Sequence, residues 1–289
     1  MKKLSKLRLF TKLNVLKKWQ KLLLLTLTFS ICFVGWIIWG NLSLEVTQYT
    51  ITSDRIPHPF DDFRIVQISD LHNAQFGADN SQLLKKIRVQ KPDIIVITGD
   101  FVDSRRTDIP LAVNFARQAV QIAPVYYIPG NHEAGIDYIG LYRELKSVGV
   151  TLLLDEGIKL EREQSYIRLL GLVDDSFRKK QTVKEALISL MPADNSYTIV
   201  LSHRPEAFAQ YVSSKADLVL CGHVHGGQFR LPFVGGLYAP GQGVFPKYDA
   251  GLYVDGQTNM VISRGIGPSR FPFRLNNRPE IVVVTLKNG

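Results

Sequence analysis

Cysteine is scarce in this chain of 289 residues, which contains only two, Cys32 and Cys221. Cys32 lies in a long apolar run and Cys221 beside a histidine-rich motif, so we do not expect them to pair. A framework of disulfides is therefore excluded, and the fold must be held together by packing. The length and the hydrophobic content of 45% predict one large domain with a full core.

Acidic residues are absent from the first 21 positions, which carry eight of the 35 Lys and Arg residues. Those eight leave 27 basic residues for the rest of the chain, against 26 acidic ones, although the whole chain has a net charge of +9. The basic excess therefore belongs to a leader and forms no face of the folded body. This distribution argues against a nucleic-acid partner, and so against a nuclease.

Charge is also absent from residues 22–39. A helix of this length rises by about 1.5 Å per residue and spans roughly 27 Å, which is enough to cross a hydrocarbon core. Trp19, Trp36 and Trp39, the three tryptophans, fall at its two ends, where an aromatic belt lies. The alternatives are a buried core helix, which the charged flank disfavours, and a cleaved signal peptide, for which no small-residue cleavage site follows. We predict an uncleaved signal anchor.

The charges around this segment predict its orientation. Eight Lys and Arg residues precede it, whereas residues 40–60 contain one, Arg55. The positive-inside rule then places the N-terminus in the cytoplasm and the body outside, in a single-pass protein of the cell membrane. The predicted organisation is a basic leader (1–21), a transmembrane anchor (22–39) and one domain (43–289).

Strand-like apolar runs alternate with helical patterns throughout the body. The predicted strands are 44–51 (exposed or at an edge), 63–69, 94–98, 125–128, 198–201 and 218–220, and the predicted helices are 81–90, 111–122, 138–147, 182–190 and 205–213. This alternation predicts parallel sheet with helical crossovers. Residues 151–173 are typical of strand, turn and strand. The Gly- and Pro-rich residues 229–289 have β runs at 259–263 and 281–286 and predict a second sheet built partly from late antiparallel strands.

Polar motifs follow five of these strands and contain five of the six histidines. Ligands of α/β sheets gather beyond the carboxyl ends of the strands, and histidine and carboxylate side chains bind divalent metals. The pattern therefore predicts a metal or catalytic site. The motifs are Asp70-Leu71-His72, Gly99-Asp100, Gly130-Asn131-His132-Glu133, Ser202-His203 and Gly222-His223-Val224-His225.

In this order the motifs resemble those of the calcineurin-like metallophosphoesterases, over about residues 43–289. Residues 221–228, with Arg230-Leu231-Pro232, 264–267 and 278–280, are similar to a membrane-associated branch near the UDP-2,3-diacylglucosamine hydrolase-type phosphodiesterases. The resemblance implies an α/β fold, a four-layer α/β/β/α sandwich of two mixed sheets flanked by helices. It also implies a metal-dependent phosphoric ester hydrolase.

The resemblance further implies a site for two divalent metals. Asp70, His72 and His225 would hold the first metal, Asp100 would bridge to the second, and Asn131, His203 and His223 would complete the second. Two cations about 3.5–4 Å apart repel each other, which is why a carboxylate is shared between them. The mixture of oxygen and imidazole ligands favours Mn²⁺, with Fe and Zn²⁺ as alternatives.

The reaction implied by the resemblance is in-line attack on phosphorus by a metal-bridging hydroxide. His132 would be no ligand but would protonate the leaving oxygen or donate a hydrogen bond in the transition state. Asp103 matches an aspartate that orients this histidine in related phosphatases. Arg204 either contacts the substrate phosphate or forms an ordinary ion pair. Glu133 supports the site or is structural.

The sequence thus predicts a membrane-anchored hydrolase that cleaves a phosphodiester or pyrophosphate bond of a membrane or envelope compound, with lipid-linked esters as one option. The alternatives are a phosphomonoesterase or nucleotidase with the same metals, and a non-catalytic metal-binding surface module. The module is disfavoured because no ligand is missing and His132 is present. Cleavage of a UDP-linked lipid would occur in the cytoplasm, and we give the predicted outward topology more weight than that substrate.

Five phenylalanines in the C-terminal part have two interpretations. They form an apolar lip for a lipid substrate, or they belong to the core. They are Phe229, Phe233, Phe245, Phe271 and Phe273.

Overall fold

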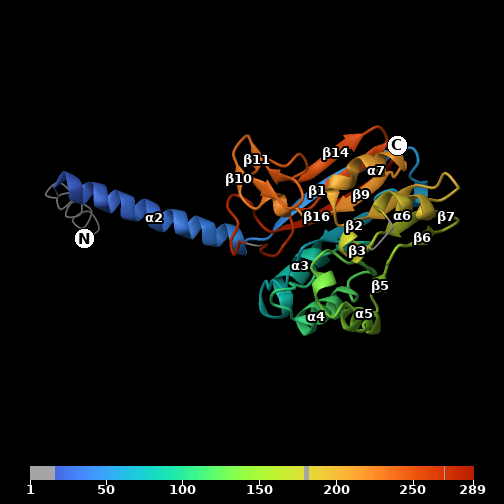
Figure 1. The fold of residues 1–289 in the computed structure, drawn as a ribbon, viewed down its shortest axis with the longest axis horizontal. Helices are drawn as coiled ribbons and strands as arrows, with labels where there is room; N and C mark the ends of the chain where they lie inside the picture. The colour runs from blue at the N-terminus through green and yellow to red at the C-terminus, as the bar shows by residue number, and fades with distance from the viewer. Residues whose placement is uncertain (1–16, 179–181, 270) are drawn as a thin grey trace, which may run out of the picture.

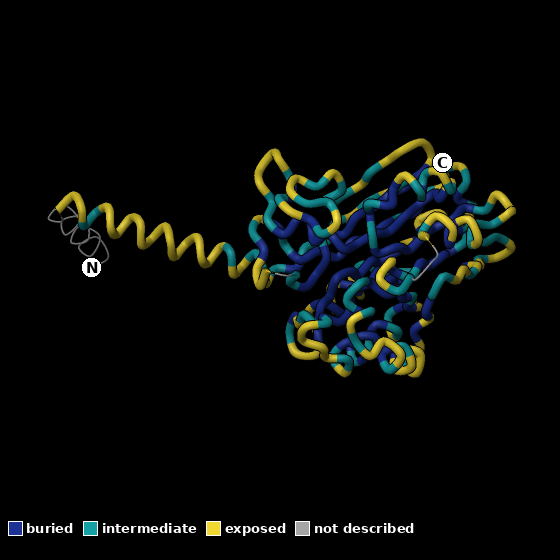
Figure 2. Tube along the Cα trace, viewed as in Figure 1, coloured by how far each residue is buried: buried dark blue, intermediate teal, exposed yellow. Residues whose placement is uncertain are grey.

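The computed structural model describes residues 17–178, 182–269 and 271–289, so most of the predicted leader lies outside it. The first described element is helix α2 (Lys18–Leu42), which projects from the folded body (Figure 1). Most of it is exposed and none of its residues is buried (Figure 2), and it is long and apolar enough to span a membrane. It contains the predicted segment 22–39 and extends it at both ends.

The first large sheet has six strands in the order β1-β16-β2-β3-β4-β5. All neighbouring strands are parallel except β16 and β2. Helices α3 (Ser81–Val89), α4 (Ile109–Ala119) and α5 (Tyr138–Ser147) connect β2 to β5 and bury their apolar faces against the outer side of this sheet. The strands are β1 (Glu45–Ser53), β2 (Arg64–Ile68), β3 (Ile94–Thr98), β4 (Val125–Ile128), β5 (Thr151–Leu152) and β16 (Glu280–Asn288).

The second large sheet has the order β14-β15-β9-β8-β7-β6, with antiparallel hairpins at its two edges. Helices α6 (Val183–Leu190) and α7 (Phe208–Ser213) pack on its outer side. The strands are β6 (Glu156–Arg162), β7 (Ser165–Gly171), β8 (Thr198–Leu201), β9 (Leu218–Cys221), β14 (Gly251–Asp255) and β15 (Thr258–Ile262).

The central core lies between the two sheets. Ile65, Val96 and Val284 of the first sheet pack against residues such as Ile199 and Leu220 of the second. The central strands of both sheets are therefore covered on both faces, and β3, β4, β8 and β9 are continuous, mainly buried apolar runs, as expected for buried parallel sheet. The predicted sandwich of two mixed sheets flanked by helices is confirmed.

Short elements complete the body. Between β9 and β14 the chain forms two small antiparallel pairs, β10 with β11 and β12 with β13. They are β10 (Arg230–Leu231), β11 (Gly235–Gly236), β12 (Tyr238–Ala239) and β13 (Gly243–Val244). The 3₁₀ turns are η1 (His58–Phe60), η2 (Ala78–Asn80), η3 (Glu133–Gly135), η4 (Asp175–Phe177), η5 (Pro205–Ala207) and η6 (His225–Gly227).

One assignment of a late strand is wrong. Residues 281–286 do not extend the second sheet, because β16 inserts into the first sheet between β1 and β2. Ile281 and Val283 face the helices and Val282 and Val284 face the central core, so both sides of β16 are buried. Only β14 and β15 are late strands of the second sheet. Residues 151–173 likewise form three strands instead of two, with β5 in the first sheet.

Candidate metal and catalytic site

The polar motifs meet at the carboxyl ends of strands from both sheets. Asp70, His72, Asp100, His223 and His225 all have positive φ angles, between 44° and 72°. Positive φ is uncommon for residues other than glycine, and such strained residues gather at functional sites. The backbone thus leaves each strand in a sharp turn that presents these side chains to one another.

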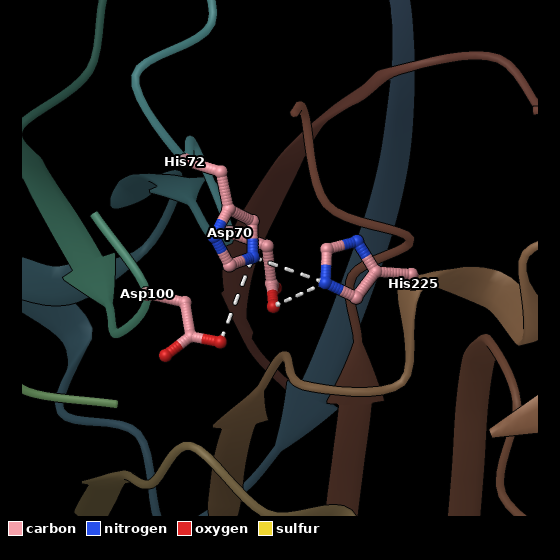
Figure 3. A group of neighbouring side chains, drawn as sticks. All are labelled: Asp70, His72, Asp100 and His225. Carbon is pink, nitrogen blue, oxygen red and sulfur yellow. Dashed lines mark hydrogen bonds and ion pairs between the residues drawn. The ribbon is translucent and has the colours of Figure 1, made fainter. Parts of the chain in front are cut away.

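The first group of converging side chains is shown in Figure 3 and comprises Asp70, His72, Asp100 and His225. One ligand atom from each lies within 4.8 Å of all the others. His72 Nε2 lies 3.1 Å from His225 Nε2 and 3.6 Å from Asp100 Oδ2. His225 Nε2 lies 3.3 Å from Asp70 Oδ1. These are the residues that the sequence predicted for the first metal, together with the bridging carboxylate.

The second group comprises Asp100, His203 and His223. His203 Nε2 lies 3.3 Å from Asp100 Oδ2 and 3.3 Å from His223 Nδ1. Asp100 Oδ2 therefore faces both groups, as a bridging oxygen must. Asn131 Oδ1 is buried and has no hydrogen-bond partner within the described chain.

These donor sets fit two divalent cations. Two imidazole Nε2 atoms face each other across 3.1 Å, at His72 and His225. Burial lowers the pKa of His72 to about 4 and that of His223 to about 3, so both rings are neutral and offer lone pairs. Metal–ligand bonds of about 2 Å place neighbouring ligands roughly 3 Å apart, which is the spacing seen here. A bound cation would also explain why Asn131 Oδ1 is buried without a hydrogen-bond partner in the described chain, because this oxygen would serve as a metal ligand.

Charge in the site is concentrated on Asp100 and His203. Burial alone would raise the pKa of Asp100, but the charge of His203 and its hydrogen bond hold that pKa well below the usual value. Burial alone would lower the pKa of His203, and Asp100 instead raises it to about 10. Burial raises the pKa of Asp70 to about 6. A bound cation supplies the same positive charge to these carboxylates, so metal binding displaces protons.

Close contacts explain two of the glycines in the motifs. A Cβ atom on Gly130 would lie 2.4 Å from Asp100 Oδ1, and one on Gly99, whose φ is +87°, would lie 2.5 Å from His203 Nδ1. His203 Nδ1 donates to the Thr98 carbonyl oxygen over 2.8 Å. The Thr98 carbonyl thus holds the Nδ1 proton, and the ring points Nε2 at Asp100 Oδ2. A divalent cation bound there would replace the proton on Nε2, and this ring orientation is typical of metal-binding histidines.

His132 lies at the open side of the site, with 18% of its side chain exposed. Its ring packs against His72 with the centroids 4.4 Å apart, and its backbone N–H donates to Asp100 Oδ1 over 2.8 Å. Its Nδ1 accepts a hydrogen bond from the backbone N–H of Ser104 over 3.1 Å. With Nδ1 acting as an acceptor, the proton of the neutral ring is on Nε2.

Asp103 lies farther from His132 than Ser104 does. Its Oδ1 is 3.5 Å from His132 Nδ1, and it accepts bonds of 3.1 and 3.2 Å from Arg105. Burial would raise its pKa, but the hydrogen bonds and the charge of Arg105 lower it. The orienting role expected of Asp103 stays a prediction. Ser104 was not expected from the sequence, because no motif marks it, although its Oγ also lies 3.1 Å from His132 Nδ1.

Glu133 is fully buried and joins two of the motif loops. Its Oε2 accepts from the N–H groups of Gly130 at 2.7 Å and Asp100 at 3.0 Å, and its Oε1 accepts from Val102 at 3.0 Å. Burial raises the pKa of Glu133 to about 7. The carboxylate supports the site through the backbone and faces no metal group.

Two arginines border the metal groups. Arg204 donates to Asp174 at 2.7 and 3.1 Å, so of its two predicted roles the structure contains the ion pair. Arg274 was missed in the sequence. Its buried guanidinium donates to the Gly267 carbonyl at 2.6 Å and lies 3.2 Å from His225 Nδ1. No motif marks Arg274, because its segment is brought to the site by the tertiary fold.

Known proteins that are similar to this chain are phosphoesterases, in agreement with the geometry of the site. The sequence pattern of the family described as calcineurin-like phosphoesterase matches residues 63–227. The chain is 34% identical over 262 residues to a Bacillus subtilis (strain 168) protein named uncharacterized metallophosphoesterase YkuE, covering 85% of this chain and 86% of that protein. It is 32% identical to phosphodiesterase YaeI of Escherichia coli (strain K12), over 78% of this chain and 82% of that one.

A further relative comes from an animal. The chain is 28% identical to a Danio rerio protein named transmembrane protein with metallophosphoesterase domain, over 85% of this chain and 58% of that protein. The shared part thus contains the whole region of the metal groups.

Proposed function

The chain belongs to the calcineurin-like phosphoesterase family and is a metal-dependent phosphoester hydrolase, and from this premise we propose a finer function. It hydrolyses a phosphodiester or pyrophosphate bond of a membrane or envelope compound while α2 anchors it in the cell membrane. The observation that carries the proposal is Asp100 Oδ2, which faces both donor groups at 3.6 and 3.3 Å. A carboxylate oxygen shared by two donor groups is the arrangement that a two-metal site requires.

The proposal assigns seven ligands to two metals. When bound, two divalent cations lower the pKa of a coordinated water and neutralise the phosphoryl oxygens. The mixture of carboxylate, amide and imidazole ligands favours Mn²⁺, with Fe and Zn²⁺ as alternatives. The first metal is assigned to Asp70, His72 and His225, the second to Asn131, His203 and His223, and Asp100 is shared.

His132 is assigned the role of proton donor. Ser104 N–H occupies its Nδ1, so the ring holds its proton at Nε2 on the open side of the site. From there it donates to an oxygen of the phosphoryl group or of the leaving group. Asp103 is assigned the orientation of this ring: its Oδ1 lies 3.5 Å from His132 Nδ1, and Arg105 holds the carboxylate in place.

The proposal also includes the predicted organisation, with a cytoplasmic leader (1–21), the span (22–39) and an extracytoplasmic domain (43–289). It is supported by α2, which is long and apolar enough to span a membrane and of which no residue is buried. The name of the Danio rerio relative is consistent with it. Outside the membrane, the substrate is a phosphoester of the membrane surface, and we propose this in preference to the cytoplasmic UDP-linked lipid of the resembling branch.

The test uses the full-length protein in detergent or nanodiscs, stripped of metal and reloaded with Mn²⁺, Fe²⁺ or Zn²⁺. We expect metal-dependent turnover of bis-p-nitrophenyl phosphate that exceeds turnover of the monoester. Asp100→Asn should lose at least one metal and most activity. Asp255→Asn is the matched control, because Asp255 is exposed at the turn of the β14–β15 hairpin.

Two other results of this assay would contradict the proposed function and favour another one. Preference for the monoester would assign the chain to the phosphomonoesterases or nucleotidases, and two bound metals without turnover of either ester would assign a binding module. Protease treatment of intact cells tests the topology independently, since a body that stays uncut contradicts the outward orientation.

A further inference from the structure

A band of exposed apolar side chains lies on the β10–β13 hairpins and on the nearby C-terminal segment. Phe233, at the tip of the first hairpin, is fully exposed, and Phe245 is 59% exposed. We call this band the apolar rim. It consists of Phe233, Val234, Val244, Phe245, Phe271 and Phe273, each of which is exposed by 42% or more. Four of the five phenylalanines that the sequence marked as lip or core are therefore not core.

The fifth phenylalanine joins the parts of the rim. Phe229 packs its ring against Phe271 and Phe273, with centroids 5.4 and 5.5 Å apart. Its carbonyl accepts from Leu237 N–H, and the Leu237 carbonyl accepts from Phe245 N–H, over 2.8 and 2.9 Å. The hairpins and the C-terminal segment thus form one continuous surface.

The rim lies beside the end of α2. Asn41, in the last turn of α2, donates to the Arg274 carbonyl over 2.9 Å and accepts from Arg274 N–H over 2.7 Å. Arg274 directly follows Phe273 in the chain. Figure 1 shows the β10–β11 hairpin at the end of the body that α2 joins, whereas β6 and β7 lie at the opposite end. The exposed apolar surface is therefore held next to the apolar helix.

The rim also borders the metal site. A cavity of about 140 Å³ is lined by Tyr238, Pro240 and Phe271 and reaches His225, a residue of the first metal group. Most of its exposed lining is apolar, so the approach to the metals from the rim is an apolar one.

We infer that the apolar rim inserts into the interfacial region of the membrane that α2 spans. Contiguous exposed apolar surface marks an interaction site. Aromatic side chains settle at the headgroup level, roughly 5–10 Å into the boundary with the acyl chains. A lipid surface is favoured over a second copy or another protein because α2 keeps the rim beside lipid permanently, at high effective concentration. The site then faces phosphoesters at headgroup level.

The inference rests on the proposed membrane span and is independent of the proposed catalysis. The test reconstitutes the full-length protein in nanodiscs whose lipids carry a nitroxide quencher near the ester bond. A fluorophore is placed on Phe233→Cys or Val244→Cys in a Cys32→Ser background, where the remaining Cys221 is buried. The control is Gln164→Cys, on the exposed turn between β6 and β7. A label on the native Cys32, near the middle of the span, reports the position of α2 itself in nanodiscs whose lipids carry the nitroxide at the end of the acyl chain instead.

We expect strong quenching of both rim labels, a blue shift of their emission and no quenching at position 164. Rim labels that stay unquenched while the Cys32 label is quenched would overturn the inference and leave the span intact. Rim labels that are shielded from water but not quenched by lipid would overturn it in favour of a protein partner. An unquenched Cys32 label would overturn both the span and the inference. Turnover of bis-p-nitrophenyl phosphate by each labelled variant checks that the site is folded.

Discussion

Removing the Glu133 carboxylate is predicted to loosen two loops of the metal site at once. Three backbone N–H groups, on Asp100, Val102 and Gly130, donate to this one side chain, which is fully buried. Glu133→Ala leaves all three donors without their acceptor. Each buried donor without an acceptor lowers the stability by about 1–3 kcal/mol. Water that enters the vacated space recovers part of this loss. We therefore expect the free energy of unfolding to fall by about 3 kcal/mol or more.

Glu133→Gln separates the hydrogen bonds from the charge. If the amide oxygen takes the place of Oε2, it keeps the bonds from Gly130 and Asp100 and loses the one from Val102. One lost bond costs about 1–3 kcal/mol. The variant also removes the negative charge of Glu133. Burial destabilises that charge, because it raises the pKa of Glu133 to about 7. Glu133→Gln should therefore be clearly more stable than Glu133→Ala.

The assay is urea unfolding of the full-length protein, followed by near-ultraviolet circular dichroism of its 11 tyrosines, none of which lies in α2. The tryptophans are unsuitable because all three lie in that helix. Glu144→Ala is the matched control, since Glu144 is exposed on α5. The reasoning would be refuted if the free energy of unfolding of Glu133→Ala lay within about 0.5 kcal/mol of the wild-type value, which is the range of ordinary surface substitutions.

Three further predictions concern the site and its surroundings. His132→Ala should lower turnover by roughly 100-fold or more while the metal content stays the same, as a proton donor outside the ligand set requires, and loss of metal in this variant would contradict that role. Chelation should lower the melting temperature, because an ion at about 100 times its Kd stabilises a fold by about 2.7 kcal/mol, and an unchanged melting curve would count against bound metal. Burial would raise the pKa of Asp174, but the Arg204 hydrogen bonds lower it, so this pair stabilises the fold above the unfolded pKa of about 4. The stability difference between wild type and Asp174→Asn should therefore be constant near neutral pH and shrink as the pH falls below 4, and a difference that grows on acidification would reverse the sign of the argument.

Much of the fold could be predicted because the central strands are buried on both faces. The apolar runs at 94–98, 125–128 and 198–201 match β3, β4 and β8 residue for residue. A short apolar run that is followed by a turn motif is typical of a buried strand, so the sequence predicts its secondary structure well. The position of β16 could not be predicted, because an apolar strand pattern specifies burial but not the neighbour with which the strand pairs.

The convergence of the motif residues was predictable for a similar reason. Asp70, Asp100 and His203 each lie two residues after a strand (β2, β3 and β8), and the carboxyl ends of these strands from both sheets meet, so the topology brings the three residues together. The partners of these residues were not predictable. Ser104 reaches His132 Nδ1 with its backbone N–H and its hydroxyl, and no motif marks this serine. Arg274 reaches His225 from a segment 49 positions away.

The central claim is that two metal ions share Asp100, and anomalous diffraction from crystals of the Mn²⁺-loaded protein tests it most directly. The account predicts two anomalous peaks about 3.5–4 Å apart on either side of Asp100 Oδ2. One peak should lie beside His72 and His225 and the other beside His203 and His223. A single peak, or none near Asp100 in fully loaded protein, would contradict it.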